Sequence, residues 1–188
     1  MPLSNPTQED ERKIHSEINQ IVNQRITITT LAVTIFGVVI AWVIPSKNEL
    51  DKIDIIEFTF FATYLLVVIL FFLFLLTHHL TYMLRLLTSY LIETKKSYWE
   101  IDWDLYRNKF KYWGYTKPIA VIFLLLGFIS LLTPFFISSV FDLQFECYFG
   151  FISAFLGIVY IVIVVGMGFC KWFAKETKFR KRWEELNK

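Results

Sequence analysis

The sequence lacks the short motifs that mark common catalytic and nucleotide-binding sites. It contains no phosphate-binding loop, no glycine-rich dinucleotide fingerprint, no G-x-S-x-G nucleophile and no HExxH zinc motif. The acids Glu100, Asp102 and Asp104 stand two residues apart and do not share one helix face, so a paired-carboxylate site is not expected. We therefore predict a protein that is not an enzyme and that carries no cofactor and no metal.

Cysteine and histidine are scarce as well. The 2 cysteines, Cys147 and Cys170, stand at opposite ends of one predicted helix, about 34 Å apart, and cannot form a disulfide with each other. Of the 3 histidines, His78 and His79 are adjacent and point in different directions on a helix, so they cannot chelate one metal well. We interpret them as polar residues at a membrane boundary, with a pH-sensing or metal-binding role as the alternative.

Charge is missing from four long stretches of a chain that is 55% hydrophobic. These stretches contain no Asp, Glu, Lys, Arg or His and cover residues 26–46, 58–77, 118–141 and 147–170. Each has about the 20 residues that a helix needs to cross a hydrocarbon core. The sequence therefore predicts an all-α integral membrane protein with four transmembrane helices and helical cytoplasmic extensions.

Basic residues set the expected orientation. Of the 19 Lys and Arg residues, only Lys47 and Lys52 lie in the two short loops that would face outward. The positive-inside rule then places both termini in the cytoplasm. The predicted segments are an N-terminal cytoplasmic amphipathic helix (1–25), the first span (26–45), an external loop (46–56), the second span (57–77), a cytoplasmic helical extension with an aromatic helix (78–117), the third span (118–141), an external loop (142–146), the fourth span (147–170) and a basic amphipathic cytoplasmic tail (171–188).

The first helix is expected to begin outside the membrane. Thr7 followed by Asp10 is a plausible helix start, and no Gly or Pro separates this segment from the first span. Helical periodicity also continues past the second span, which predicts one helix from about residue 57 to 94. Both helices should therefore extend beyond the lipid on the cytoplasmic side.

Two further cytoplasmic surfaces are predicted from periodicity. An aromatic stripe with helical spacing is expected to receive a cytoplasmic protein partner: Trp99, Trp103, Tyr106, Phe110 and Trp113. The C-terminal tail is predicted to form an amphipathic helix, with Trp172, Phe179, Trp183 and Leu186 on its apolar face, and is expected to lie on anionic lipids. Its basic residues include Lys178, Arg180, Lys181 and Arg182.

The first span carries a polar, small-residue stripe with helical spacing. It comprises Asn23, Thr27, Thr30, Thr34, Gly37 and Ala41. Such a stripe either lets a neighbouring helix approach closely or lines a path for water and ions. Four helices of one chain leave no channel, so a pore would require several copies, with Val38 to Ile44 as a hydrophobic gate.

The remaining membrane features favour helix packing. Small residues in the fourth span, Gly150, Ala154 and Gly157, are spaced for close contact between helices. Pro134 comes late in the third span and indicates a packing kink. A secondary transporter is disfavoured, since no span has an ionisable residue at mid-depth.

The segments "NQRITITTLAVTIFGVVIAW" and "RLLTSYLIE…WEIDW" resemble small prokaryotic four-span membrane proteins that are encoded with antiphage defence systems. The resemblance covers roughly residues 11–105 and matches no ligand motif. It implies a prokaryotic inner-membrane protein that either permeabilises the membrane or anchors a cytoplasmic partner, as in Kiwa-type systems.

Two hypotheses follow. In the first, the protein is a homo-oligomeric membrane effector of antiphage defence. Its threonine stripe lines an ion-conducting or membrane-permeabilising pore that is gated through the cytoplasmic layer. In the second, it is a non-conducting scaffold or sensor that anchors a cytoplasmic partner protein. Nucleic acid is not expected as a partner under either hypothesis.

Overall fold

The computed structural model describes residues 7–44, 52–94, 116–141 and 147–169, together with Trp183 and Glu185. This part of the chain contains four long helices and no strand: α1 (Gln8–Val43), α2 (Lys52–Glu93), α4 (Thr116–Phe141) and α5 (Cys147–Gly168). All four are long and apolar enough to cross a membrane. The prediction of an all-helical protein with four membrane-spanning helices is therefore confirmed at this level.

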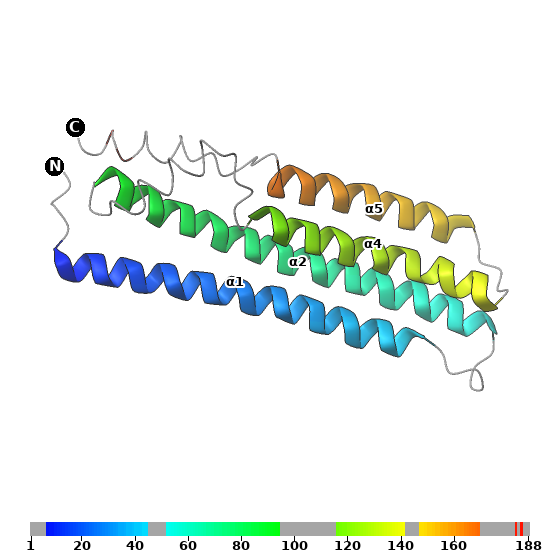
Figure 1. The fold of residues 1–188 in the computed structure, drawn as a ribbon. Coiled ribbons are helices and arrows are strands. Elements are labelled where there is room, and N and C mark those ends of the chain that lie inside the picture. Colours follow the sequence, from blue (N-terminus) through cyan, green and yellow to red (C-terminus); the bar gives the residue numbers. More distant parts are fainter. Residues whose placement is uncertain are drawn as a thin grey trace.

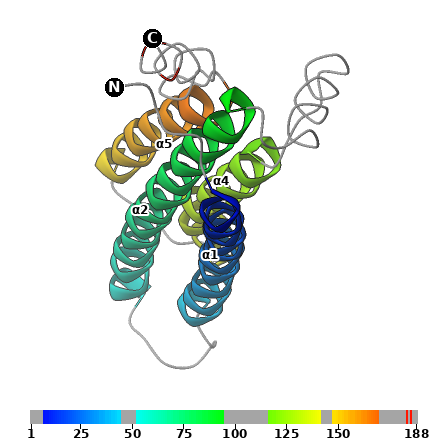
Figure 2. The same ribbon diagram turned by 90° about the vertical axis from the view of Figure 1, so that its left-hand side faces the viewer.

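The helices form a bundle in which α2 and α4 lie between α1 and α5 (Figures 1 and 2). Helices that follow one another in the chain pack side by side, and α2 also touches α5. Among the described residues α1 and α5 make no contact, because α2 and α4 separate them. α1 is consequently a peripheral helix with one wide face outside the bundle.

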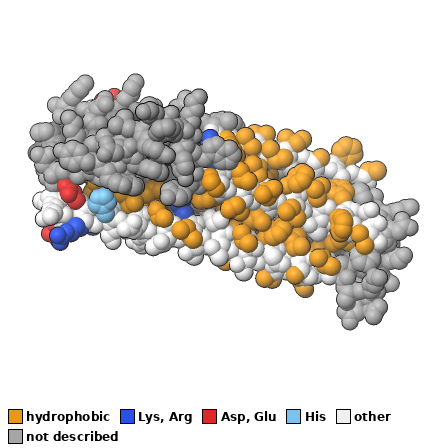
Figure 3. Space-filling model, viewed as in Figure 1, with side chains coloured by type: hydrophobic (Ala, Val, Ile, Leu, Met, Phe, Trp, Pro, Cys, Tyr) orange, Lys and Arg blue, Asp and Glu red, His pale blue; other side chains and the backbone are white. Residues whose placement is uncertain are grey.

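The two longest helices extend past the membrane-spanning length at one end of the bundle. α1 has 36 residues and α2 has 42, which correspond to about 54 Å and 63 Å, against a hydrocarbon core of about 30 Å. In the view of Figure 3 hydrophobic side chains are spread over much of the described surface, and the acidic and several basic side chains lie near the end where α1 begins. The helices thus leave the apolar zone together at this polar end.

The ends of α1 follow from local chemistry. Thr7 caps the N-terminus: its hydroxyl accepts a hydrogen bond from the Asp10 backbone at 3.3 Å, and the Asp10 carboxylate accepts one from the Thr7 backbone at 2.8 Å. Ile44 is extended, with φ −73° and ψ 108°, because a residue that precedes proline avoids the helical region. The predicted start at Thr7 and the unbroken passage into the first span are both confirmed.

α2 also forms without interruption, from Lys52 to Glu93. The predicted continuation beyond the apolar stretch is confirmed. Its start lies five residues earlier than predicted. Between Lys52 and Glu57 there is no Gly or Pro that would stop a helix.

The core of the bundle is filled by side chains from all four helices. It comprises Ala32, Leu66, Val67, Leu70, Phe74, Ala120, Phe123, Leu126, Leu131, Tyr160 and Val164. The rings of Phe74 and Phe123 meet edge to face at 5.5 Å. Two tyrosines add hydrogen bonds between helices: Tyr160 donates to the Phe123 carbonyl at 2.7 Å, and Tyr64 donates to the Phe149 carbonyl at 2.9 Å. Close packing and a few polar contacts are what hold helices together in lipid.

Candidate functional site

The polar stripe of α1 lies on the outer face of the bundle. Every one of its members is exposed: Asn23, Thr27, Thr30, Thr34, Gly37 and Ala41. A side-chain carbon added at Gly37 would meet no atom within 4 Å. The inner face of the same helix carries Ala32 and Val43, which are buried. Within the described part of the chain, therefore, no other helix covers the stripe.

Two hydroxyl groups of the stripe bond to their own helix. Thr27 donates to the Asn23 carbonyl at 3.0 Å, and Thr34 donates to the Thr30 carbonyl at 3.0 Å. The Thr30 hydroxyl donates to no group in the described part of the chain. Self-bonded threonines tolerate lipid at little cost, whereas Thr30 retains a free donor on this face.

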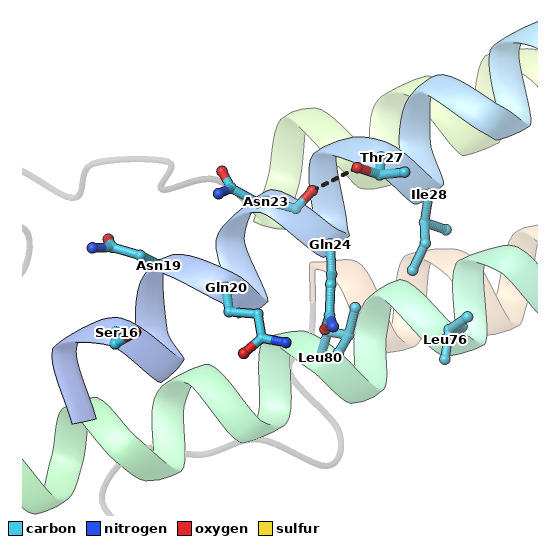
Figure 4. Close-up of a pocket in the computed structure, with 9 residues that line it drawn as sticks. All are labelled: Ser16, Asn19, Gln20, Asn23, Gln24, Thr27, Ile28, Leu76 and Leu80. Carbon is cyan, nitrogen blue, oxygen red and sulfur yellow. Dashed lines mark hydrogen bonds between the residues drawn. The ribbon is translucent and has the colours of Figure 1, made fainter. Parts of the chain in front are cut away.

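At the polar end the stripe runs into a groove between α1 and α2. The groove has a volume of about 770 Å³ and is lined by Ser16, Asn19, Gln20, Asn23, Gln24, Thr27, Ile28, Leu76 and Leu80. Figure 4 shows the amide side chains of Asn19 and Asn23 reaching outward from α1, while Gln24 and Ile28 face Leu76 and Leu80 of α2. Asn23 and Thr27 belong to both the stripe and the groove, so the two form one continuous polar surface.

The chemistry of this surface is that of neutral hydrogen bonding. Amides supply both donors and acceptors, and hydroxyls supply one donor and two lone pairs. None of the residues that line the groove or the stripe is titratable. The surface can therefore hold water or an uncharged polar group, and its own lining supplies no acid or base that would activate a hydroxyl group.

The other predicted surfaces have different outcomes. The aromatic stripe from Trp99 to Trp113 lies outside the described residues, and so do Lys178, Arg180, Lys181 and Arg182 of the tail. In α5, Gly157 is buried, and a side-chain carbon added there would lie 3.3 Å from the Leu131 side chain of α4. Ala154 is exposed, and a carbon added at Gly150 would meet nothing within 4 Å. Only Gly157 of these three therefore approaches another described helix closely.

Two residues of the tail are described, and one of them, Trp183, contacts α2. The indole of Trp183 donates to the Ser89 hydroxyl at 3.2 Å and meets the ring of Tyr90 at 5.0 Å. Trp183 belongs to the apolar face that periodicity assigned to the lipid surface. At this position the face packs on the extension of α2 outside the apolar zone.

A buried basic cluster was not anticipated from the sequence. Arg25 and His78 are 4% and 7% exposed, and both keep buried nitrogen atoms that have no hydrogen-bond partner. The interpretation of both histidines as polar residues at a membrane boundary stays a prediction; within the protein His78 faces inward, whereas His79 is exposed. A signal for Arg25 was present: it shares a helix face with Ile14 and Ile18, so it is a charge on an apolar face.

Among the described residues, no group of three or more His, Cys, Asp or Glu side chains could hold a metal ion. Comparison of the chain with protein-family models, curated proteins and solved structures found no match.

Proposed function

We propose that the protein is a homo-oligomeric membrane effector in which the α1 stripes of several copies surround an ion-conducting or membrane-permeabilising path. The supporting observation is that all six stripe residues are exposed on the outer face of α1. A polar, small-residue face on a peripheral membrane helix gains hydrogen bonds and close contact when it meets its equivalents in other copies. The alternative, packing within one chain, has no partner helix on this face in the described bundle.

The depth of the stripe favours a path through the membrane. Thr34 lies nine residues beyond Arg25, about 14 Å along the helix axis at about 1.5 Å per residue. It is therefore near the middle of a hydrocarbon core of about 30 Å. The stripe joins the amide groove at the polar end, so hydrogen-bonding groups extend continuously from outside the apolar zone to mid-depth.

The interior of one bundle does not favour conduction, because Leu70 and Phe123 at its centre are fully buried by their neighbours. A path between copies does not have this obstacle. Beyond Gly37 the outer face of α1 becomes apolar, with Val38 and Trp42 64% and 69% exposed. In the proposed oligomer these side chains form the hydrophobic gate.

The wider setting of the proposal rests on the sequence alone. The distribution of basic residues favours cytoplasmic termini, and the resemblance favours an inner-membrane effector of prokaryotic antiphage defence. In this setting a cytoplasmic protein partner triggers the pore through the helices that extend from the membrane.

Ion flux in liposomes tests the proposal. The double variant Thr30→Leu with Thr34→Leu removes two hydroxyls from the stripe and should abolish flux of the reconstituted full-length chain. The matched control is Ile158→Leu with Val162→Leu, which changes two exposed residues with the same spacing on α5 and should leave flux unchanged. Equal flux from both double variants would contradict the proposal, and wild-type protein without flux would favour the non-conducting scaffold.

A further inference from the structure

The buried basic cluster lies where α1 and α2 leave the apolar zone. Arg25 immediately precedes the uncharged stretch of α1 and points to the inner side of the helix, opposite the polar stripe. It is 4% exposed, and its Nε and Nη2 atoms have no hydrogen-bond partner. The guanidinium therefore presents two nitrogen atoms with unpartnered N–H groups inside the protein.

His78 of α2 extends this basic environment. It is 7% exposed, and its Nε2 atom also has no partner. Arg25, Arg85 and His79 all act electrostatically on His78, and Arg85 also acts on Arg25. Within the described part of the chain, every residue that acts on Arg25 or His78 in this way is basic.

A guanidinium buried without a counter-charge is strongly unfavourable, so proteins pair buried arginines with an anion. The fork of N–H donors on arginine matches the oxygen atoms of phosphate, which makes arginine the preferred residue for phosphate recognition. The position at the edge of the apolar stretch is also the level at which lipid phosphates lie. The position of Arg25 and its donor chemistry therefore both favour a phosphate group as its counter-charge.

We propose that Arg25 and His78 form a binding site for a phosphate group between α1 and α2, in which Nε and Nη2 of Arg25 and protonated Nε2 of His78 donate to the phosphate oxygens. The phosphate belongs either to an anionic lipid or to a water-soluble molecule. The site is separate from the predicted lipid contact of the C-terminal tail, and it does not depend on whether the protein conducts ions.

Thermal unfolding of the full-length chain in an uncharged maltoside detergent tests this site. The added probes are dioleoylphosphatidylglycerol, dioleoylglycerol, which has the same acyl chains and no phosphate, and inorganic phosphate. Arg25→Gln removes the main donor. Its matched control is Arg12→Gln, because Arg12 is exposed on the same helix. His78→Gln and the exposed His79→Gln form a second matched pair.

A ligand that binds only the folded state raises the unfolding midpoint. Phosphatidylglycerol should raise the wild-type midpoint and dioleoylglycerol should not. Arg25→Gln should weaken the apparent affinity by about tenfold or more, since a hydrogen bond from a charged group contributes at least this much. Arg12→Gln should respond like the wild type, and His78→Gln should weaken binding less than Arg25→Gln while His79→Gln does not weaken it. A response to inorganic phosphate as well identifies a water-soluble ligand as sufficient, whereas a response to the lipid alone identifies the lipid.

Two results would overturn the proposal. The first concerns the ligand response: either neither phosphatidylglycerol nor inorganic phosphate raises the wild-type midpoint, or the midpoint of Arg25→Gln rises as much as that of the wild type. The second concerns stability without any ligand. The proposal expects Arg25→Gln to be at least as stable as the wild type, since the substitution removes an unpaired buried charge. A large loss of stability under these conditions would mean that the guanidinium already has a partner.

Discussion

Threonines occur at helical spacing in both α1 and α2, yet they occupy opposite environments. Thr27, Thr30 and Thr34 of α1 are exposed on the outside of the bundle. Four of the five threonines of α2 are buried inside the bundle: Thr59, Thr63, Thr77 and Thr81. The helices as wholes differ in the same way: 11% of the apolar stretch of α1 is buried, against 44% of that of α2.

The comparison separates two uses of the same side chain. In α2, the Thr63 hydroxyl donates to the carbonyls of Thr59 and Phe60 at 2.8 and 3.0 Å, so a buried polar group is satisfied by its own helix. In α1 the hydroxyls lie on a surface that no described helix covers. The buried threonines support the fold, whereas the exposed ones are available to another copy of the chain or to water.

Cysteine cross-linking between copies should occur at the outer face of α1 and not at the outer face of α5. In a chain whose Cys147 and Cys170 are replaced by serine, Thr34→Cys on α1 should join copies to one another through a short bis-maleimide. Ile158→Cys, which is on the outer face of α5 and 63% exposed, should not. Gel electrophoresis measures the result, and equal cross-linking at both positions would mean that α1 has no special role in assembly.

Two glycines show the same difference between a packed and an open helix face, and replacing the packed one should give the largest change in the free energy of unfolding. A side-chain carbon at Gly127 would collide with the ring of Tyr160, whereas one at Gly37 meets nothing. Gly127→Ala should lower the free energy of unfolding by about 1–3 kcal/mol, the usual cost of overpacking. Gly37→Ala should leave it unchanged or raise it by up to about 1 kcal/mol, because alanine favours the helix. Titration with sodium dodecyl sulfate measures both, and a larger loss at Gly37 would reverse the assignment of inner and outer faces.

Hydrogen bonds between helices should contribute less. The Tyr64 hydroxyl donates to the Phe149 carbonyl and lies 2.9 Å from the Ser153 hydroxyl, which joins α2 to α5. Tyr64→Phe should cost about 0.6 kcal/mol, the average measured for such bonds in a membrane bundle, and at most about 1.7 kcal/mol. The same titration measures it. No loss of stability would show that the contact between α2 and α5 depends on packing alone.

The smallest expected change in unfolding free energy comes from replacing a threonine of the buried set or of the exposed set. Thr63→Val removes a buried, satisfied hydroxyl and should cost up to about 1 kcal/mol in unfolding free energy. Thr30→Val removes an exposed hydroxyl and should change the stability of the single chain by less than about 0.5 kcal/mol, while it reduces flux through the proposed pore. Unchanged flux in Thr30→Val, together with unchanged flux in the double leucine variant, would assign the stripe no role in conduction.

Much of the fold could be predicted from the sequence because its causes are local. Uninterrupted apolar stretches gave four spans, the Thr7 cap gave the start of α1, and the absence of breakers gave the length of α2. The face of each helix that packs could not be predicted in this way. In lipid, the neighbouring helix and the surrounding acyl chains are equally apolar, so hydrophobic periodicity does not separate the inner face from the outer one.

The candidate site shows the same limit. The residues of the α1 stripe could be found by spacing, but their exposure depends on where α2 and α4 pack. The environments of Arg25 and Trp183 also depend on contacts across the bundle: Arg25 is covered from outside its own helix, and Trp183 contacts Ser89, 94 positions away in the chain. Spacing within one segment carries no information about such distant neighbours.

The mass of the purified protein, corrected for bound detergent by light scattering on a sizing column, tests whether other copies cover the α1 stripe. The expected result is a complex of at least four chains of 22.4 kDa each, which Thr30→Leu with Thr34→Leu shifts to a smaller species. A wild-type mass of a single chain would contradict the proposed pore, because the interior of one bundle is filled by its own side chains.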